Sequence, residues 1–357
     1  MEVKKERRRL LVIMFLLAIL IVISVALSVS FGAANINFFE IWQAILSPDL
    51  TLTNHAVIHN VRLPRVLASL LVGACFAVSG AIMQGIIRNP LADSGILGIN
   101  GGATLAIALC FAFGRGMAYN QLLMMSFIGA ALAAIVVFGI SSTAKGGSTT
   151  FRLTLAGAVI SALLVCLSQG VALYFNLSQD LAYWSAGGMA GITWPQLVIS
   201  APIILVTLLA SFILAPYITI LNIGDEVATS LGQRTVFIRL FSILIILTLA
   251  GIAVSLAGNV AYVGLIVTHI VKLLVGGKYQ SIIPISALFG GWFLLIADLA
   301  ARLINAPQET PLGALTALIG VPFFIYLIKT IRTRIIPKRN SCFFGVKLLM
   351  RHPFLSF

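Results

Sequence analysis

LLVIMFLLAILIVISVALSVSF, residues 10–31, is the stretch that decides the fold class of this protein. It contains no charge, and its length of about 22 residues matches the roughly 20 helical residues that cross the hydrocarbon of a bilayer. A basic segment precedes it, as in a signal peptide, but the apolar core of a cleavable signal has only about 7 to 15 residues. We therefore interpret residues 10–31 as a retained transmembrane helix.

The rest of the chain repeats this pattern. Of 357 residues, 60% are hydrophobic and 9% are charged, whereas a soluble domain is about half apolar and about one quarter charged. Charges and clusters of Pro and Gly divide the chain into ten apolar spans: residues 10–31, 64–87, 94–113, 120–143, 152–176, 195–215, 237–257, 260–275, 282–303 and 312–331. We expect an all-α integral membrane protein with about ten transmembrane helices in one compact permease-like domain, residues 1–335, followed by a basic tail, residues 336–357.

The net charge of +13 gives the spans a direction. The cations do not form a stripe with interleaved aromatic residues, so we expect no nucleic-acid partner. They gather before the first span and after the last, which predicts that both termini are cytoplasmic under the positive-inside rule. With this topology, four of the 23 Lys and Arg residues lie outside: Arg62, Arg65, Arg115 and Arg302.

Two local features qualify this picture. The eighth span, residues 260–275, is short and carries His269 and Lys272, so it could be a broken or re-entrant helix.

The four cysteines have no C-x-x-C spacing and lie mostly inside apolar runs, which favours buried thiols over metal ligands or disulfides. We expect no metal site and no cofactor. The cysteines are Cys75, Cys110, Cys166 and Cys342.

The inner segment between the sixth and seventh spans reads LNIGDEVATSLGQ, residues 221–233. Asp225 can cap the N-terminus of a helix, Glu226 suits the positive end of its dipole, and Gly232 can end it in the left-handed conformation. The sequence thus predicts a short cytoplasmic helix, and on local features alone an ordinary loop helix is the simpler interpretation.

Three arginines are predicted to lie on the outer side, although Lys and Arg are usually in excess on the cytoplasmic side. Arg62 and Arg65 flank Pro64, a natural first-turn residue of a helix, and Arg302 lies at the outer end of the ninth span. They could extend to lipid headgroups, or Arg302 could pair with Asp298 at i, i+4. Alternatively, they could bind carboxylates of a soluble partner, because the guanidinium fork binds carboxylates in bidentate geometry.

The chain has no motif for an energy-yielding reaction. No G-x-x-x-x-G-K-[ST] loop is present to bind ATP phosphates, and no G-x-S-x-G or H-E-x-x-H motif occurs. Asp298 and His269 are the ionisable residues nearest to membrane depth and therefore candidates for ion coupling. We expect a protein that is not itself an enzyme and that is driven by a gradient or by another subunit.

Several short strings occur in a fixed order along the chain. They are Arg62-Leu63-Pro64-Arg65, Gly73-Ala74, Ser79-Gly80, Gln84, Arg88-Asn89-Pro90-Leu91-Ala92, Leu97-Gly98, residues 224–232, Tyr262-Val263-Gly264-Leu265 with His269, Ala297-Asp298 with Arg302, Pro311-Leu312-Gly313, Thr316-Ala317 and residues 319–323. Together they resemble the FecCD family, the permeases of bacterial ABC importers for iron-siderophores, haem and cobalamin.

The resemblance implies a permease of the cobalamin and siderophore type in the bacterial cytoplasmic membrane. Its implied partners are a second permease subunit, two ATP-binding subunits, an extracytoplasmic substrate-binding protein and the lipid bilayer. The implied docking residues for the binding protein are Arg62, Arg65 and Arg302. The implied ATPase-coupling residues are Gly224, Asp225, Glu226, Ala228, Ser230, Leu231 and Gly232.

The chain departs from the family pattern near the eighth span. Thr268 replaces the usual Pro, Lys272 replaces the usual Arg, residues 277–280 replace an Asp-His-Arg-like turn, and Asp93-Ser94 replaces an acidic-Pro pair. These differences affect the expected local geometry more than the expected function. The tail beyond about Arg334 has no counterpart in the family pattern.

The resulting hypothesis is that the chain translocates an iron(III)-siderophore chelate while ATP is hydrolysed on partner subunits. Three alternatives remain open at this point: a permease for haem or cobalamin, an ion-coupled secondary transporter that uses Asp298 and His269, and a membrane scaffold without transport.

Overall fold

The computed structural model describes residues 2–31, 38–47, 49, 51–114, 116–143, 150–306 and 308–335, and within these ranges the chain contains helices and no strands. Each predicted apolar span corresponds to one helix. The helices are α1 (Glu2–Ser30), α4 (Leu63–Ile87), α5 (Ile99–Phe113), α6 (Tyr119–Thr143), α7 (Thr150–Tyr174), α9 (Trp194–Ile223), α11 (Thr235–Ala257), α12 (Val263–Val275), α13 (Tyr279–Leu303) and α14 (Leu312–Ile335).

Seven apolar helices in these ranges are long enough to cross a membrane, and α5, α12 and the apolar part of α14 are shorter. This confirms the prediction of an all-α membrane protein with about ten membrane helices. The predicted tail, residues 336–357, lies outside the described residues.

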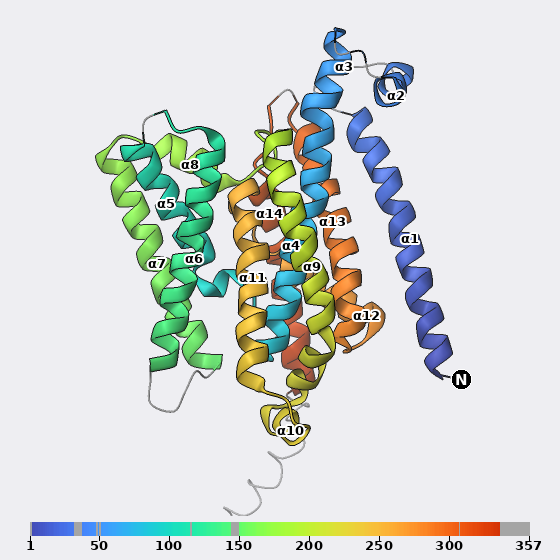
Figure 1. Ribbon diagram of the computed structural model, residues 1–357, viewed down its shortest axis with the longest axis vertical. Helices are drawn as coiled ribbons and strands as arrows, with labels where there is room; N and C mark the ends of the chain where they lie inside the picture. The colour runs from blue at the N-terminus through green and yellow to red at the C-terminus, as the bar shows by residue number, and fades with distance from the viewer. Residues whose placement is uncertain are drawn as a thin grey trace, which may run out of the picture.

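The long helices lie side by side along the longest axis of the molecule (Figure 1). Helices α5, α6 and α7 with the short α8 (Ser178–Ala186) form a group on one flank, and α1 lies on the opposite flank. Helix α10 (Asp225–Ser230) lies at the end where α1 begins, which we call the α10 end. The opposite end carries α2 (Phe38–Leu46) and α3 (Thr53–Val57), and we call it the arginine end.

Helix α4 forms the centre of the bundle and is buried along nearly its whole length. It packs closely on its neighbours because glycine, without a Cβ, lets two backbones approach. Gly73 lies against Gly290 of α13, and Gly80 lies against Gly264 of α12. A Cβ placed on Gly80 would lie 2.5 Å from the Cα of Gly264, so this contact excludes any side chain.

The helix that contains Pro64 begins earlier than the sequence indicates. Pro64 does lie in the first turn of α4, but α3, a π-helical turn at Ile58–Arg62 and α4 form one continuous helix, Thr53–Ile87. The helix of the eighth span begins later than the sequence indicates, because α12 starts only at Val263, after non-helical residues 258–261, and Tyr262 has a left-handed φ of 68°. A 3-10 turn, Ser94–Leu97, joins α4 to α5.

Candidate functional site

The three outward arginines of the sequence prediction come together at the arginine end. Arg62 and Arg65 lie at the start of α4, and Arg302 lies in the last turn of α13. All three side chains are buried, with exposed fractions of 5% to 6%. Extension to lipid headgroups is therefore wrong as an explanation of these residues.

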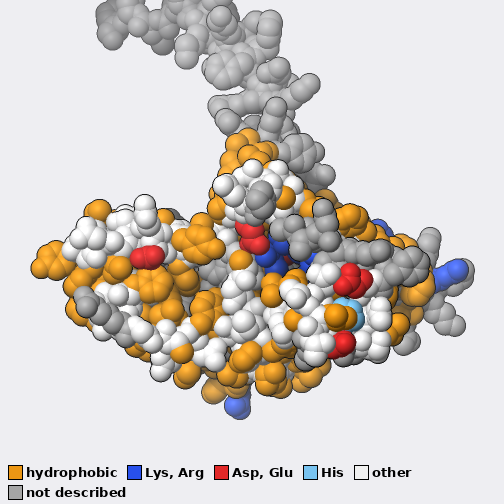
Figure 2. All heavy atoms as spheres, turned by 90° about the horizontal axis from the view of Figure 1, so that it is seen from above, with side chains coloured by type: hydrophobic (Ala, Val, Ile, Leu, Met, Phe, Trp, Pro, Cys, Tyr) orange, Lys and Arg blue, Asp and Glu red, His pale blue; other side chains and the backbone are white. Residues whose placement is uncertain are grey.

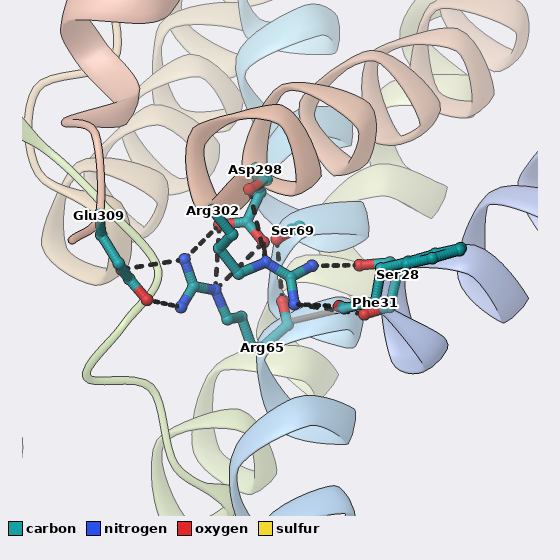
Figure 3. Close-up of polar contacts among 7 residues, drawn as sticks. All are labelled: Ser28, Phe31, Arg65, Ser69, Asp298, Arg302 and Glu309. Carbon is teal, nitrogen blue, oxygen red and sulfur yellow. Dashed lines mark hydrogen bonds and ion pairs between the residues drawn. The ribbon is translucent and has the colours of Figure 1, made fainter. Parts of the chain in front are cut away.

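Arg65 is held by two carboxylates. Its Nε lies 3.1 Å from each oxygen of Asp298 and its Nη2 lies 2.9 Å from Oδ1. Its Nη1 donates to Glu309 over 2.5 Å, and its Nη2 donates to the other oxygen of Glu309 over 3.1 Å. Figure 3 shows the guanidinium between the two acids, with Asp298 buried and Glu309 on the segment before α14.

Arg302 and Arg62 bind the end of α1. Arg302 pairs with Asp298 at 3.3 Å, the i, i+4 contact that the sequence indicates, and donates to the carbonyl and hydroxyl oxygens of Ser28 (Figure 3). Arg62 Nη1 donates to the carbonyl oxygens of Val29 and Ser30 over 2.7 and 3.0 Å. Carbonyls at the end of a helix have no intrahelical donor, so these arginines cap the C-terminus of α1. Their positive charges also interact favourably with the negative end of the α1 helix dipole.

Two carboxylates of the cluster form ion pairs with two of its arginines. Asp298 pairs with Arg65 and Arg302, and Glu309 pairs with Arg65. Burying a charge is expensive unless it is paired and hydrogen-bonded. Asp298 and Glu309 pair with Arg65 and Arg302 in this way, and the backbone carbonyls at the end of α1 are among the acceptors of Arg62.

A pocket of about 470 Å³ opens onto this cluster. Its lining includes Arg65, Asp298 and Glu309 of the cluster, together with Tyr183 and Trp184 of α8. Seen from above the arginine end, basic and acidic side chains gather near the centre of the face (Figure 2). The charged cluster is therefore accessible from this end, although each arginine is individually buried.

The second predicted site, residues 224–232, lies at the α10 end. Gly224, in an extended conformation, separates α9 from α10, and Gly232 follows α10 with a left-handed φ of 79°, as predicted. Ala228 is buried against the bundle, whereas Glu226, Ser230 and Leu231 are exposed. The segment thus presents a mixed polar and apolar face away from the protein.

The predicted capping role of Asp225 is wrong. Gly224 is the N-cap residue, and the side chain of Asp225 makes no capping hydrogen bond. Its carboxylate instead pairs with Arg88 at 2.9 Å and with Arg239 at 2.8 Å. Arg88 follows the last residue of α4 and Arg239 lies in the first turns of α11. Asp225 therefore ties α10 to two membrane helices.

Two polar contacts near the middle of the bundle were not assigned a role from the sequence. Asp93 reaches α12 from the segment between α4 and α5, since a Cβ on Gly264 would lie 3.1 Å from its Oδ1. Asn100 of α5 donates to Asn259, in the interruption before α12, over 2.8 Å. In the sequence, Asp93 is marked only by its place beside Ser94, where the chain departs from the family pattern. Nothing in the local sequence indicates that Asp93 lies next to Gly264.

The departures near the eighth span still form specific contacts. Lys272 Nζ lies 2.9 Å from Gln84 Oε1 and 5.6 Å from the centre of the Tyr279 ring. His269 packs edge-on against Phe323, with ring centres 5.7 Å apart. Lys272 thus links α12 to α4, and His269 links α12 to α14. In the described part of the chain no group of three or more His, Cys, Asp or Glu residues could hold a metal ion.

Comparison with known proteins gives consistent matches over nearly the whole chain. The model of the FecCD transport family matches residues 19–330. The iron(3+)-hydroxamate import system permease protein FhuB of Bacillus subtilis is 47% identical over 305 residues, which cover 85% of this chain and 79% of that protein. The iron-uptake system permease protein FeuB of the same organism is 40% identical, with coverage of 87% and 92%.

A haem relative and a solved structure extend the comparison. The hemin transport system permease protein HmuU of Yersinia pestis is 36% identical over 88% of this chain and 94% of its own length. A solved structure, reported as an inward-facing conformation of a metal-chelate type ABC transporter, superimposes with a TM-score of 0.78 at 28% identity, and covers 88% of this chain and 98% of that chain.

Proposed function

This chain belongs to the FecCD transport family, and from that premise we propose that it is the membrane-spanning permease subunit of an ABC importer for an iron(III)-siderophore chelate. The observation that carries the proposal is the 47% identity to an iron-hydroxamate permease over most of both chains. Haem is the second candidate cargo, because a hemin permease matches over a similar length at 36% identity. The chain itself supplies no catalytic residue in this proposal, since ATP is hydrolysed on partner subunits.

The proposed orientation follows from the charge distribution. Residues 4–9 are basic and precede the membrane part of α1, which favours a cytoplasmic N-terminus. Since α1 begins at the α10 end, that end is cytoplasmic and the arginine end faces outward (Figure 1). The end of α14 at Ile335 then also lies on the cytoplasmic side, because α14 runs toward the α10 end (Figure 1).

We propose that residues 224–232 contact the ATP-binding subunits. The exposed side chains of Glu226, Ser230 and Leu231 form the contact, and buried Ala228 holds the helix on the bundle. Gly224 and Gly232 bound the segment. Asp225 faces the membrane helices, so a displacement of α10 during ATP-driven closure pulls on α4 through Arg88 and on α11 through Arg239.

We propose that Arg62, Arg65 and Arg302 receive an acidic residue of the extracytoplasmic binding protein. The pocket that opens onto Arg65, and the exposed position of its partner Glu309 in the same pocket, support this role. Because Arg65 is already paired, docking requires an exchange of partners. Glu309 is the partner that can leave, since its side chain is 43% exposed whereas that of Asp298 is 1% exposed.

The function is tested by reconstituting the permease with its ATP-binding subunits and binding protein in proteoliposomes. Uptake of a radiolabelled ferric hydroxamate should require ATP and should exceed uptake of haem and cobalamin. Uptake that persists without the ATP-binding subunits and follows an ion gradient would instead identify a secondary transporter. Preference for haem or cobalamin would reject the proposed cargo and keep the ABC mechanism.

The coupling role is tested on the exposed face of α10. The double variant Glu226→Ala with Leu231→Ala leaves the Asp225 ion pairs intact and should lower both uptake and transport-linked ATP hydrolysis. Leu163→Ala, at an exposed position of α7 away from α10, is the control. Equal uptake by the two proteins would exclude this face as the ATPase contact.

A further inference from the structure

A second cavity, of about 390 Å³, lies at the α10 end beside the proposed coupling segment. Its lining comes from the last part of α9, the connection after α10 and the first turns of α11. The residues that matter for its chemistry are Tyr217, Leu231, Gln233, Arg234, Phe237 and Phe241. The proposed contacts of α10 do not use it, apart from the shared Leu231.

The polar side chains of this groove lack partners inside the protein. The guanidinium of Arg234 makes no ion pair or hydrogen bond with the residues that the structure describes. The amide nitrogen and oxygen of Gln233 are both screened from solvent and have no hydrogen-bond partner in the same part of the chain. Arg234 is exposed, so its positive charge is available to an anionic group from outside the protein.

The apolar walls indicate what kind of ligand it is. Phe237 and Phe241 are 55% and 57% exposed, and with Tyr217 they form an aromatic wall. Tyr and Trp are enriched at the level of lipid headgroups, which suits Tyr217, and the exposed rings of Phe237 and Phe241 present apolar surface suited to acyl chains. The wall continues along α11 into the exposed Leu244, deeper in the proposed membrane region, where a soluble subunit cannot reach.

We propose that this groove binds an anionic phospholipid of the cytoplasmic leaflet. Arg234 holds the phosphate, and the acyl chains run along Phe237 and Phe241. Basic pockets between membrane helices on the cytoplasmic side bind such headgroups in other proteins. The site is independent of the cargo and rests only on the orientation of the α10 end.

The site lies where a lipid can influence coupling. Arg234 directly precedes α11, and the connection between α10 and α11 contains Leu231 and Gly232. A phosphate bound to Arg234 holds this connection against the membrane surface. Bound lipid therefore favours one position of α10 relative to α11, while the Asp225 pairs on the other side of α10 remain in place.

Native mass spectrometry of the permease with its ATP-binding subunits tests the proposal. The complex is released from vesicles of phosphatidylglycerol and phosphatidylcholine, and the retained lipids are identified. Arg234→Gln should lower retention of phosphatidylglycerol relative to phosphatidylcholine by about fivefold, the effect of one cation at the membrane surface. Arg9→Gln removes the same charge from the exposed basic end of α1 and should lower retention less than Arg234→Gln, because the other cations of residues 4–9 remain there.

A second readout does not depend on recovery of the complex. Tyr217→Trp places a fluorophore in the groove, and brominated phosphatidylglycerol should quench it more strongly than brominated phosphatidylcholine. Equal quenching by both lipids would overturn the proposal. An equal decrease in phosphatidylglycerol retention for Arg234→Gln and Arg9→Gln would overturn it as well. Loss of the lipid when the ATP-binding subunits bind would also overturn it, because the groove would then belong to their interface. Failure of iron uptake would leave these readouts unaffected, so the two proposals fail separately.

Discussion

Asp298 should be the most sensitive polar position at the arginine end. Its carboxylate accepts from Arg65 and Arg302 and is fully buried. Asp298→Asn keeps the size of the side chain and removes its negative charge. One of the two acceptor oxygens becomes an amide donor that faces guanidinium donors. The substitution therefore leaves two buried cations without their shared counter-ion.

The size of the effect follows from this burial. Removing one partner of a buried ion pair typically costs about 3 to 5 kcal/mol, because the remaining charge stays in a poorly solvating environment. Glu309→Gln provides the matched control, since it also neutralises a carboxylate bound to Arg65. The Glu309 side chain is 43% exposed, and exposed pairs contribute only about 0 to 1 kcal/mol.

The difference is measurable as the free energy of unfolding in mixed micelles titrated with SDS. Asp298→Asn should lower the free energy of unfolding several times more than Glu309→Gln does. It should also reduce the amount of protein inserted in the membrane. A loss for Asp298→Asn below about 1 kcal/mol, similar to that expected of an exposed pair, would refute the reasoning. The cluster would then be hydrated, and its charges would not depend on each other.

Three further changes probe packing, coupling and docking. Gly80→Ala should lower the free energy of unfolding by about 1 to 3 kcal/mol through overpacking against α12, whereas Gly139→Ala, with open space around it, should be neutral or stabilising in the same titration. A double-mutant cycle between Asp225→Ala and Arg239→Ala should give a coupling energy of about 0.2 to 1 kcal/mol, because both groups are partly exposed; no coupling would mean that the pair does not hold α10. Glu309→Gln should increase the affinity of the binding protein, most clearly at low salt, because it releases Arg65; an unchanged affinity, measured by surface plasmon resonance, would argue against partner exchange.

The ten helices could be predicted because a bilayer requires long apolar runs, and such runs are visible without any tertiary contact. Their ends could not be predicted as well. The sequence places the end of the sixth span near residue 215 because Pro216 follows, but α9 continues to Ile223 with Pro202 and Pro216 inside it. Proline is tolerated in membrane helices where neighbours satisfy the backbone groups that it frees. The local rule therefore stops the helix too early.

The site residues could be named from the sequence, but only the local contacts between them could be predicted. The pair of Asp298 and Arg302 follows from helical spacing, one turn apart. The contact of Arg65 with Glu309 joins positions 244 residues apart, and that of Arg302 with Ser28 joins positions 274 apart. Nothing in a single sequence marks such partners. The capping role predicted for Asp225 failed for the same reason, because distant arginines compete for its carboxylate.

The position of α4 between the two proposed contact sites has a mechanical consequence. Its 25 residues span about 37 Å, from the arginine cluster to the Arg88 pair with Asp225. Its close contacts at Gly73 and Gly80 leave no space for α4 to bend or slide independently of α13 and α12. Densely packed interiors transmit displacement because they resist compression. We therefore expect a force applied to α10 to move α4, α12 and α13 together. Arg65 of α4 and Asp298 of α13 then keep their mutual geometry, and the displacement of α10 is passed to the arginine end as a movement of the whole pair.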